Sequence, residues 1–256
     1  MLLYDSTYED MYRVLTQERE KVDFTLEKLS VKAMKEFRDR TVFPAYFINY
    51  YTVPASRNKY IVCHYMLSND KYMDGLGVMI LNEDDGAQQV IDVTSCKRFV
   101  PTKGMVSIID KSMPYEERIV MMNIYTAHFL NRYRTRLIET GLISPSKKGT
   151  LTTAEIACMY LSRNRKNIIS IPYEQMVLMP EKYRNGIALQ VNDGIVFGSQ
   201  KSFTGTDGKE VYVNRLNTIV SRDMLKQSQA DNVVPDKTIQ HVKVLKELLK
   251  ERKRRK

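Results

Sequence analysis

Four short runs of residues constrain the fold of this chain most, because each alternates in polarity with a period of two. They span residues 45–53, 59–67, 75–83 and 87–95. This period is typical of β-strands, whose successive side chains point to opposite faces of a sheet. The stretches between the runs are short and rich in Pro, Asn, Asp and Gly, as in tight turns. We therefore expect an antiparallel meander from Ala45 to Ser95.

Further strands follow, and helical patterns flank them. We expect strands at 105–109 and 119–125, and a short strand or a buried connection at 168–173. A hairpin over 186–200 around Asn192-Asp193-Gly194 and a last strand at 210–221 follow. A capping box at residues 6–9 predicts a helix that runs to about Arg40, with a break near 21–24 and an end before Pro44. A second capping box, Thr152 to Glu155, predicts a short helix.

The expected fold class is α+β: an antiparallel β-sheet with helices packed on one face and helical N- and C-terminal extensions. The expected organisation is an N-terminal helical segment (1–43), an α+β core (44–230) and a C-terminal basic amphipathic helix (231–256). A short helix is expected at 223–229, at the end of the core. Apolar residues make up 43% of the chain, which is enough for a packed core of this length.

The net charge of +10 is concentrated at the C-terminus. Residues 243–256 hold eight Lys or Arg and two Glu, which is +6 of the total, so the other 242 residues carry only +4. A basic tail of this kind favours an anionic polymer as partner. The tail residues expected to contact nucleic acid are Lys250, Arg252, Lys253, Arg254, Arg255 and Lys256.

Several classes of protein are disfavoured by what the sequence lacks. No apolar run approaches membrane-spanning length, and the N-terminus has no secretory pattern, so we expect a cytoplasmic protein without a membrane partner. Cys63, Cys96 and Cys158 form no CxxC pair, and we expect reduced thiols and no metal site. Motifs for nucleotide phosphates, zinc proteases and serine hydrolases are absent, and we expect no cofactor.

The strongest candidate site begins where the expected strand at 119–125 changes to a helical pattern. His128, Arg132 and Arg136 are spaced four residues apart, so they share one helical face. Guanidinium groups stay charged and bind phosphate with a planar fork, and imidazole can exchange a proton near neutral pH. The alternative is structural: Arg is common on helices, and carboxylates elsewhere in the fold could pair with this face.

The other titratable and aromatic residues have simpler interpretations. His64 is expected to be a partly buried sheet residue and His241 a surface residue of the last helix. The tyrosines of the meander could form a base-stacking platform, but half-buried sheet positions explain them better.

The His-x3-Arg-x3-Arg helix, followed by antiparallel strands with Thr218 in the closing strand, resembles toxin ribonuclease domains of the RelE and BrnT type. The resemblance covers at most residues 119–221. It implies metal-independent RNA cleavage through the ribose 2′-hydroxyl, with His128, Arg132 and Arg136 as catalytic residues. The residues that we expect to bind the substrate are Tyr133, Lys201 and Thr218. The chain departs from that pattern by its long N-terminal region and by the segment at 150–180.

Two functions follow as hypotheses. The first is a cytosolic protein that acts on nucleic acid, RNA rather than DNA, as a ribonuclease-like enzyme. The second is a non-catalytic nucleic-acid-binding, protein-binding or structural protein of a phage or mobile element, with a protein partner on its C-terminal helix. An enzyme needs His128 to face a pocket with a second proton carrier such as Tyr125, Tyr133 or Lys201 within reach, whereas a binding protein needs only surface charge.

Overall fold

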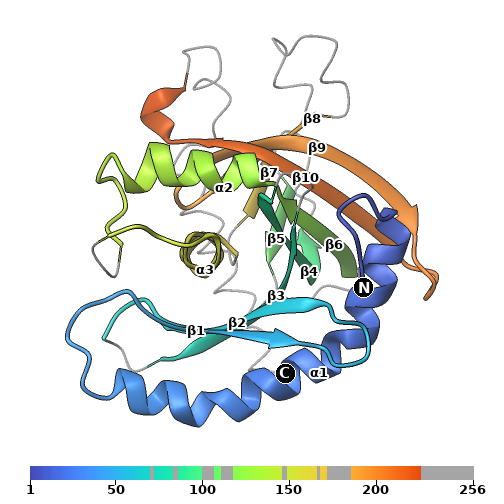
Figure 1. Ribbon diagram of the computed structural model, residues 1–256. Coiled ribbons are helices and arrows are strands. Elements are labelled where there is room, and N and C mark those ends of the chain that lie inside the picture. Colours follow the sequence, from blue (N-terminus) through green and yellow to red (C-terminus); the bar gives the residue numbers. More distant parts are fainter. Residues whose placement is uncertain are drawn as a thin grey trace, which may run out of the picture.

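The computed structural model describes residues 1–69, 72–82, 86–99, 107–110, 118–145, 149–165, 168–171 and 186–225. These residues form one sheet with helices on both of its faces (Figure 1). The strands in this part of the chain are β1 (Ala45–Thr52), β2 (Lys59–Met66), β3 (Asp74–Asn82), β4 (Gln88–Phe99), β5 (Ser107–Asp110), β6 (Arg118–Tyr125), β7 (Ile168–Ile171), β8 (Gly186–Val191), β9 (Gly194–Thr204) and β10 (Glu210–Val220). The helices are α1 (Tyr8–Phe37), α2 (Ala127–Tyr133) and α3 (Thr153–Asn164), with a π-helical turn η1 (Arg134–Ile138) and a 3-10 turn η4 (Arg222–Met224).

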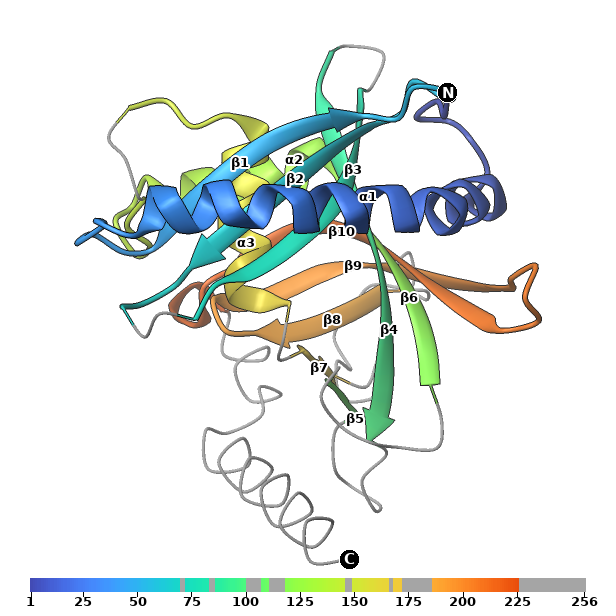
Figure 2. The same ribbon diagram turned by 90° about the horizontal axis from the view of Figure 1, so that it is seen from below.

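The strand pairings are antiparallel except for one. Strands β1 to β4 form the expected meander, in which Ala45 pairs with Met66 and Tyr60 with Met79. Strand β4 is long enough to pair with β3 near its start, with β5 near its end and with β6 between. Strand β6 then pairs with β10 in parallel. The pairings β4-β5-β7-β8-β9-β10-β6-β4 therefore return to their starting strand, and the sheet curls strongly (Figure 2).

Helix α1 lies across the face of β1–β3 that is opposite α2 and α3 (Figures 1 and 2). Its buried residues Met11, Leu15 and Val22 follow a helical period and pack against that face of the sheet. Gly77 on β3 permits this close approach, because a Cβ there would lie 2.4 Å from Val22 Cγ1. Glycine at this point is therefore required by helix packing rather than by backbone conformation.

A buried carboxylate also fastens α1 to the β1–β2 connection. The Glu18 side chain accepts hydrogen bonds from Tyr60 Oη at 2.6 Å, from Asn58 Nδ2 at 3.1 Å and from Ser56 Oγ. Burial is the main cause that raises the pKa of Tyr60, and its hydrogen bond to Glu18 acts in the same direction. Three donors thus hold a buried acid where the described residues supply no cation.

The second core contains α2 and α3. Helix α3 lies between α2 and the strands β1 and β2, and nearly all of its residues are buried (Figure 1). The Tyr160 ring packs against Phe129, Tyr125 and Tyr133, with ring centroids 4.9, 5.3 and 5.2 Å away. The Cys63 and Cys158 thiols are free and buried in the same core.

The predicted α+β class with a mostly antiparallel sheet is confirmed, although helices pack on both faces of the sheet and not on one. Most local boundaries agree within two residues. Three details differ. The N-cap of α1 is Thr7, which accepts from Asp10 N, and not Ser6, whose hydroxyl instead accepts from Leu3 N. The predicted break near residues 21–24 is absent, because Val22 stays in register with the buried face. The helix after β6 changes to a π-helical turn at Arg134. The strand predicted at 105–109 is β5, whereas the terminal helix predicted at 231–256, with His241, lies outside the described residues.

The tyrosines of the meander are mostly sheet residues, as predicted. Tyr60 and Tyr65 are buried, Tyr46 and Tyr51 are half-buried, and Tyr50 is exposed. His64 is also buried, and burial lowers its pKa. Among the described residues no helix is both long and apolar enough to cross a membrane.

Candidate phosphate-binding face on helix α2

The candidate site is positioned by the start of α2 against the edge of β10. Thr126 is the N-cap: its hydroxyl accepts from Phe129 N at 3.1 Å and donates to Leu216 O at 3.0 Å. The parallel pairing of β6 with β10 ends here, at Tyr125 and Leu216. Helix α2 therefore follows the free edge of β10 from the point where β6 leaves it.

His128 and Arg132 meet on the outer side of α2, as the spacing predicts. Arg132 Nε donates to His128 Nε2 at 3.2 Å. His128 is exposed and Arg132 is half-buried. One nitrogen of the imidazole is thus engaged by the guanidinium, and no carboxylate among the described residues pairs with Arg132.

Arg136 lies on the same side of the helical segment as Arg132, and it also forms hydrogen bonds to β10. Its Nη1 donates to Thr218 Oγ1 at 3.1 Å and to Ile219 O at 2.9 Å. These acceptors lie just after the irregularity that the register of β10 shows between Leu216 and Thr218. Arg136 therefore satisfies a backbone carbonyl at the sheet edge, and the structure brings together the predicted residues Arg136 and Thr218.

The local backbone supports this reach. Glu139 N donates to Arg134 O at 2.9 Å, so the hydrogen bond spans five residues in place of four. A π-helical turn of this kind widens the helix, and such turns occur frequently at functional sites. Sequence reasoning missed both the π-helical turn and the Ile219 carbonyl, since neither leaves a signal in the spacing of residues.

Arg132 and Arg136 make this face positively charged, and no carboxylate within the described ranges forms an ion pair with either of them. Burial lowers the pKa of Arg136, and the positive charge of Arg132 lowers it further. Arg132 and Arg136 are four residues apart, so their like charges lie on the same side of the helical segment. Arg134, Arg163 and Arg165 differ, because each pairs with a carboxylate: Glu139, Asp193 and Asp92, respectively.

Tyr133, a predicted substrate-binding residue, lies away from this face. It is fully buried, and its hydroxyl donates to Asp193 Oδ2 at 2.8 Å. The Asp193 carboxylate also accepts from Arg163 Nη2 and Asn164 Nδ2, both at 2.7 Å. Burial, followed by the charge of Asp193, raises the pKa of Tyr133. This network fastens the β8–β9 turn to α2 and α3, so its role is structural.

Lys201 is also separate from the face. Its Nζ lies 6.0 Å from the ring centroid of Tyr8 on α1. Lys201 is four residues along β9 from Phe197, the neighbour of Thr218, which corresponds to about 13 Å of strand. Tyr125 is buried among aromatic rings. The three candidate proton carriers are therefore not grouped around His128. The predicted tail residues, Lys250 to Lys256, lie outside the described part of the chain.

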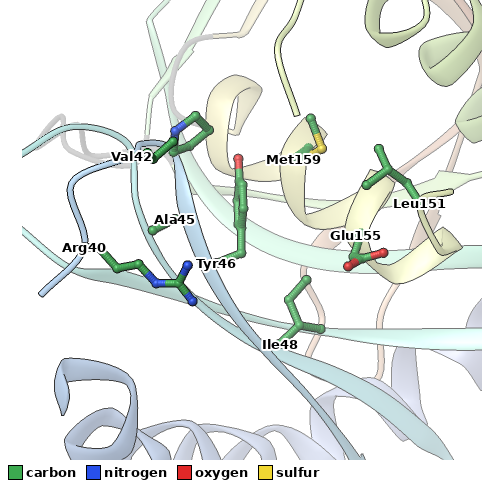
Figure 3. Close-up of a pocket in the computed structure, with 9 residues that line it drawn as sticks. Arg40, Val42, Ala45, Tyr46, Ile48, Leu151, Glu155 and Met159 are labelled. Carbon is green, nitrogen blue, oxygen red and sulfur yellow. The ribbon is translucent and has the colours of Figure 1, made fainter. Parts of the chain in front are cut away.

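A pocket of about 280 Å³ lies elsewhere, between β1 and α3 (Figure 3). Ala45, Ile48, Leu151 and Met159 supply apolar walls, and the Tyr46 ring stands between them. The polar lining comes from Arg40 and from Glu155, which is engaged in the capping box of α3. Within the described residues no group of three or more His, Cys, Asp or Glu side chains could hold a metal ion.

Comparisons with known proteins found no matching family model, no matching curated protein and no matching solved structure.

Proposed function

We propose that the protein is a cytosolic, non-catalytic nucleic-acid-binding protein that holds a backbone phosphate on the outer face of α2. The observation that carries the proposal is the pair of arginines Arg132 and Arg136, which are four residues apart on one side of the helical segment and have no carboxylate partner among the described residues. A phosphate between them would relieve their repulsion and accept charge-assisted hydrogen bonds. The Thr218 hydroxyl offers a further polar contact beside Arg136.

A binding role fits this geometry better than a catalytic one. General acid–base cleavage of RNA needs two positioned proton carriers. His128 is exposed, but Tyr125 and Tyr133 are buried and Lys201 lies beside α1. The basic tail adds +6 of charge that could follow a polyanion. RNA is the preferred polymer, because the resemblance of the His-Arg-Arg helix is to RNA-cleaving domains.

The proposal is tested by measuring the affinity for fluorescently labelled single-stranded RNA, and for DNA of the same sequence, over a range of salt concentrations. Loss of one phosphate contact in Arg132→Ala should weaken binding and reduce the slope of log K against log salt by about 0.7. Arg136→Ala should act in the same direction, with its folding checked by circular dichroism, because Arg136 also caps the β10 edge.

The matched control is Arg134→Ala. Arg134 lies on the same helical segment, but it is paired with Glu139 and hydrogen-bonded to Asn131. Its replacement should leave RNA affinity nearly unchanged. Equal losses in all three variants would mean that only overall charge matters, and no loss in Arg132→Ala or Arg136→Ala would refute a phosphate site on this face.

A further inference from the structure

Strand β1 is an edge strand of the sheet along its whole length. It pairs with β2 on one side, and no strand among the described residues lies on its other side. Every other strand in the described part of the chain pairs with at least two neighbours. The backbone of β1 is therefore open on one side to pairing with a further extended segment.

The backbone groups that face this open side can be assigned from the hairpin that joins β1 to β2. Val53 N donates to Asn58 O at 2.9 Å, so this pair is hydrogen-bonded across the two chains. In an antiparallel ladder, alternate residues of a strand direct their N–H and C=O groups toward the same neighbour. The residues of β1 whose N–H and C=O groups point away from β2 are therefore Tyr46, Ile48, Tyr50 and Thr52.

The sequence of β1 has none of the features that usually protect an exposed edge. Its residues, AYFINYYT, include no charged residue, no proline and no glycine. The register with β2 runs from Ala45 to Thr52 without a bulge. Because soluble proteins generally block an open edge with lysine, proline, a bulge or a covering segment, an unprotected edge of this length indicates a site of strand addition.

An apolar pocket adjoins the same strand (Figure 3). Tyr46 and Ile48 of β1, together with Leu151 and Met159 of α3, line its volume of about 280 Å³. Val42, which also lines the pocket, is 66% exposed. A strand added at the usual spacing of about 4.8 Å would direct alternate side chains to the side of the sheet that holds α3. One apolar side chain of such a strand could therefore enter the pocket.

The charges at the pocket indicate which segment would fit. Arg40 lines the pocket, is exposed, and forms no ion pair with a carboxylate in the described part of the chain. Glu155 is held by Thr152 in the capping box of α3. A carboxylate on the added segment would therefore be attracted to Arg40. The basic residues 243–256 of this chain would set like charges against Arg40, and β1 of a second copy carries no charge.

We propose that β1 binds an extended peptide segment of a partner protein, which pairs with residues 46–50 as an additional strand. The segment places one apolar side chain in the pocket and one carboxylate at Arg40. Main-chain hydrogen bonds supply the affinity in this kind of recognition, and side-chain pockets supply the specificity. The site does not depend on the proposed RNA contact, because α3 lies between β1 and α2 (Figure 1).

Amide hydrogen exchange of the full-length chain tests whether the edge is open. The N–H groups of Ile48 and Tyr50 should exchange rapidly, whereas those of Asn49 and Tyr51, which face β2, should be protected. Protection of Ile48 and Tyr50 in the chain alone would show that another segment of this chain, or a second copy, covers β1. That result would overturn the proposal.

A phage-displayed library of random linear peptides, each somewhat longer than β1, supplies the binding probe. Selection on the full-length chain should enrich peptides that alternate apolar and polar residues and carry Asp or Glu. A labelled peptide of this kind should bind in solution and protect Ile48 and Tyr50 from exchange. A selection that yields no such peptide, or a bound peptide that leaves both amides unprotected, would refute strand addition to β1.

Backbone N-methylation of the selected peptide tests the strand pairing without changing the protein. Methyl groups on one set of alternate residues should abolish binding, because those N–H groups face β1. Methyl groups on the other set should leave the affinity nearly unchanged. Equal effects of the two sets would contradict a paired strand.

Arg40→Glu tests the charge contact. It should weaken binding of the acidic peptide about tenfold or more, and a peptide with Lys in place of its Asp or Glu should regain affinity for this variant. The matched control is Arg38→Glu, which makes the same charge change at an exposed position that does not line the pocket. It should leave the affinity nearly unchanged. Equal losses in both variants would mean that only overall charge matters and would refute the contact with Arg40.

Discussion

Arg165, at the end of α3, forms a buried ion pair with Asp92 in the middle of β4. The Arg165 Nε to Asp92 Oδ2 distance is 3.1 Å, and the Nη2 to Oδ1 distance is 3.3 Å. The Asp92 side chain is 1% exposed and that of Arg165 is 13% exposed. The pair therefore joins the central helix to the strand that pairs with β3, β5 and β6.

We expect Asp92→Ala to lower the free energy of unfolding by about 3–5 kcal/mol, because it leaves the Arg165 charge buried without its partner. The measurement is denaturant unfolding followed by circular dichroism. The double variant Asp92→Leu, Arg165→Met should lose less stability than the single one, since it removes both charges. A loss below about 1 kcal/mol in Asp92→Ala would show that water reaches Arg165.

Stability should fall steeply in alkaline solution because of buried tyrosines. Burial is the leading cause that raises the pKa of Tyr46, Tyr60, Tyr65, Tyr133 and Tyr160 above the ordinary value of 10.0. In the unfolded chain these phenols ionise near pH 10, whereas in the folded chain they stay protonated. The contribution of these tyrosines to the free energy of unfolding is therefore fully present below pH 10, and it is lost as the pH rises above 10.

Above pH 10, the free energy of unfolding should fall by up to about 1.4 kcal/mol per pH unit for each tyrosine that stays protonated in the folded chain. Urea unfolding at a series of pH values measures it, with tyrosinate absorbance as a second probe. Tyr60→Phe should make the free energy of unfolding fall less steeply with pH, because one of the buried tyrosines is then missing. Ionisation of these tyrosines near pH 10 without unfolding would contradict the expectation.

Removal of the C-terminal tail should weaken binding to polynucleotides without changing preference among sequences. A chain that ends at Asn232 lacks the net charge of +6 carried by residues 243–256, and its salt slope should flatten by up to about four for single-stranded RNA. Titrations at several salt concentrations check this. Unchanged affinity would show that the tail serves solubility or a protein partner.

We expect the purified chain to leave RNA intact and His128→Ala to bind RNA nearly as well as the original chain. The reason is that Tyr125 and Tyr133 are buried and Lys201 lies beside Tyr8 on α1, so none of these candidate proton carriers is grouped with His128. Incubation with labelled RNA, with and without divalent cations, measures cleavage.

The opposite result would be equally clear. Metal-independent cleavage that falls about 10²-fold or more in His128→Ala, Arg132→Ala and Arg136→Ala, but not in Arg134→Ala, would identify a ribonuclease. The binding proposal would then be replaced by the catalytic hypothesis that the sequence suggested.

Strands, helix caps and contacts between residues close in the sequence could be predicted from the sequence. The reason is that the strand and helix periods fix which nearby side chains share a face, whatever the position of the segment in the fold. The meander from β1 to β4, the capping box of Thr152 and Glu155, and the contact between His128 and Arg132 are of this kind. One local detail was not predictable, because Ser6 and Thr7 are both suitable N-cap residues for α1. The Ser6 hydroxyl accepts a hydrogen bond from Leu3 N in the preceding turn, and Thr7 is the N-cap, which accepts from Asp10 N.

Relationships between distant segments were decided only by the tertiary structure. The parallel pairing of β6 with β10 gives α2 its place along a free strand edge, and this makes Ile219 O a partner of Arg136, 83 residues away. Tyr133 and Asp193 are 60 residues apart, and Arg165 and Asp92 are 73. No local period encodes such partners, because which buried charge meets which depends on how the whole sheet curls around α3.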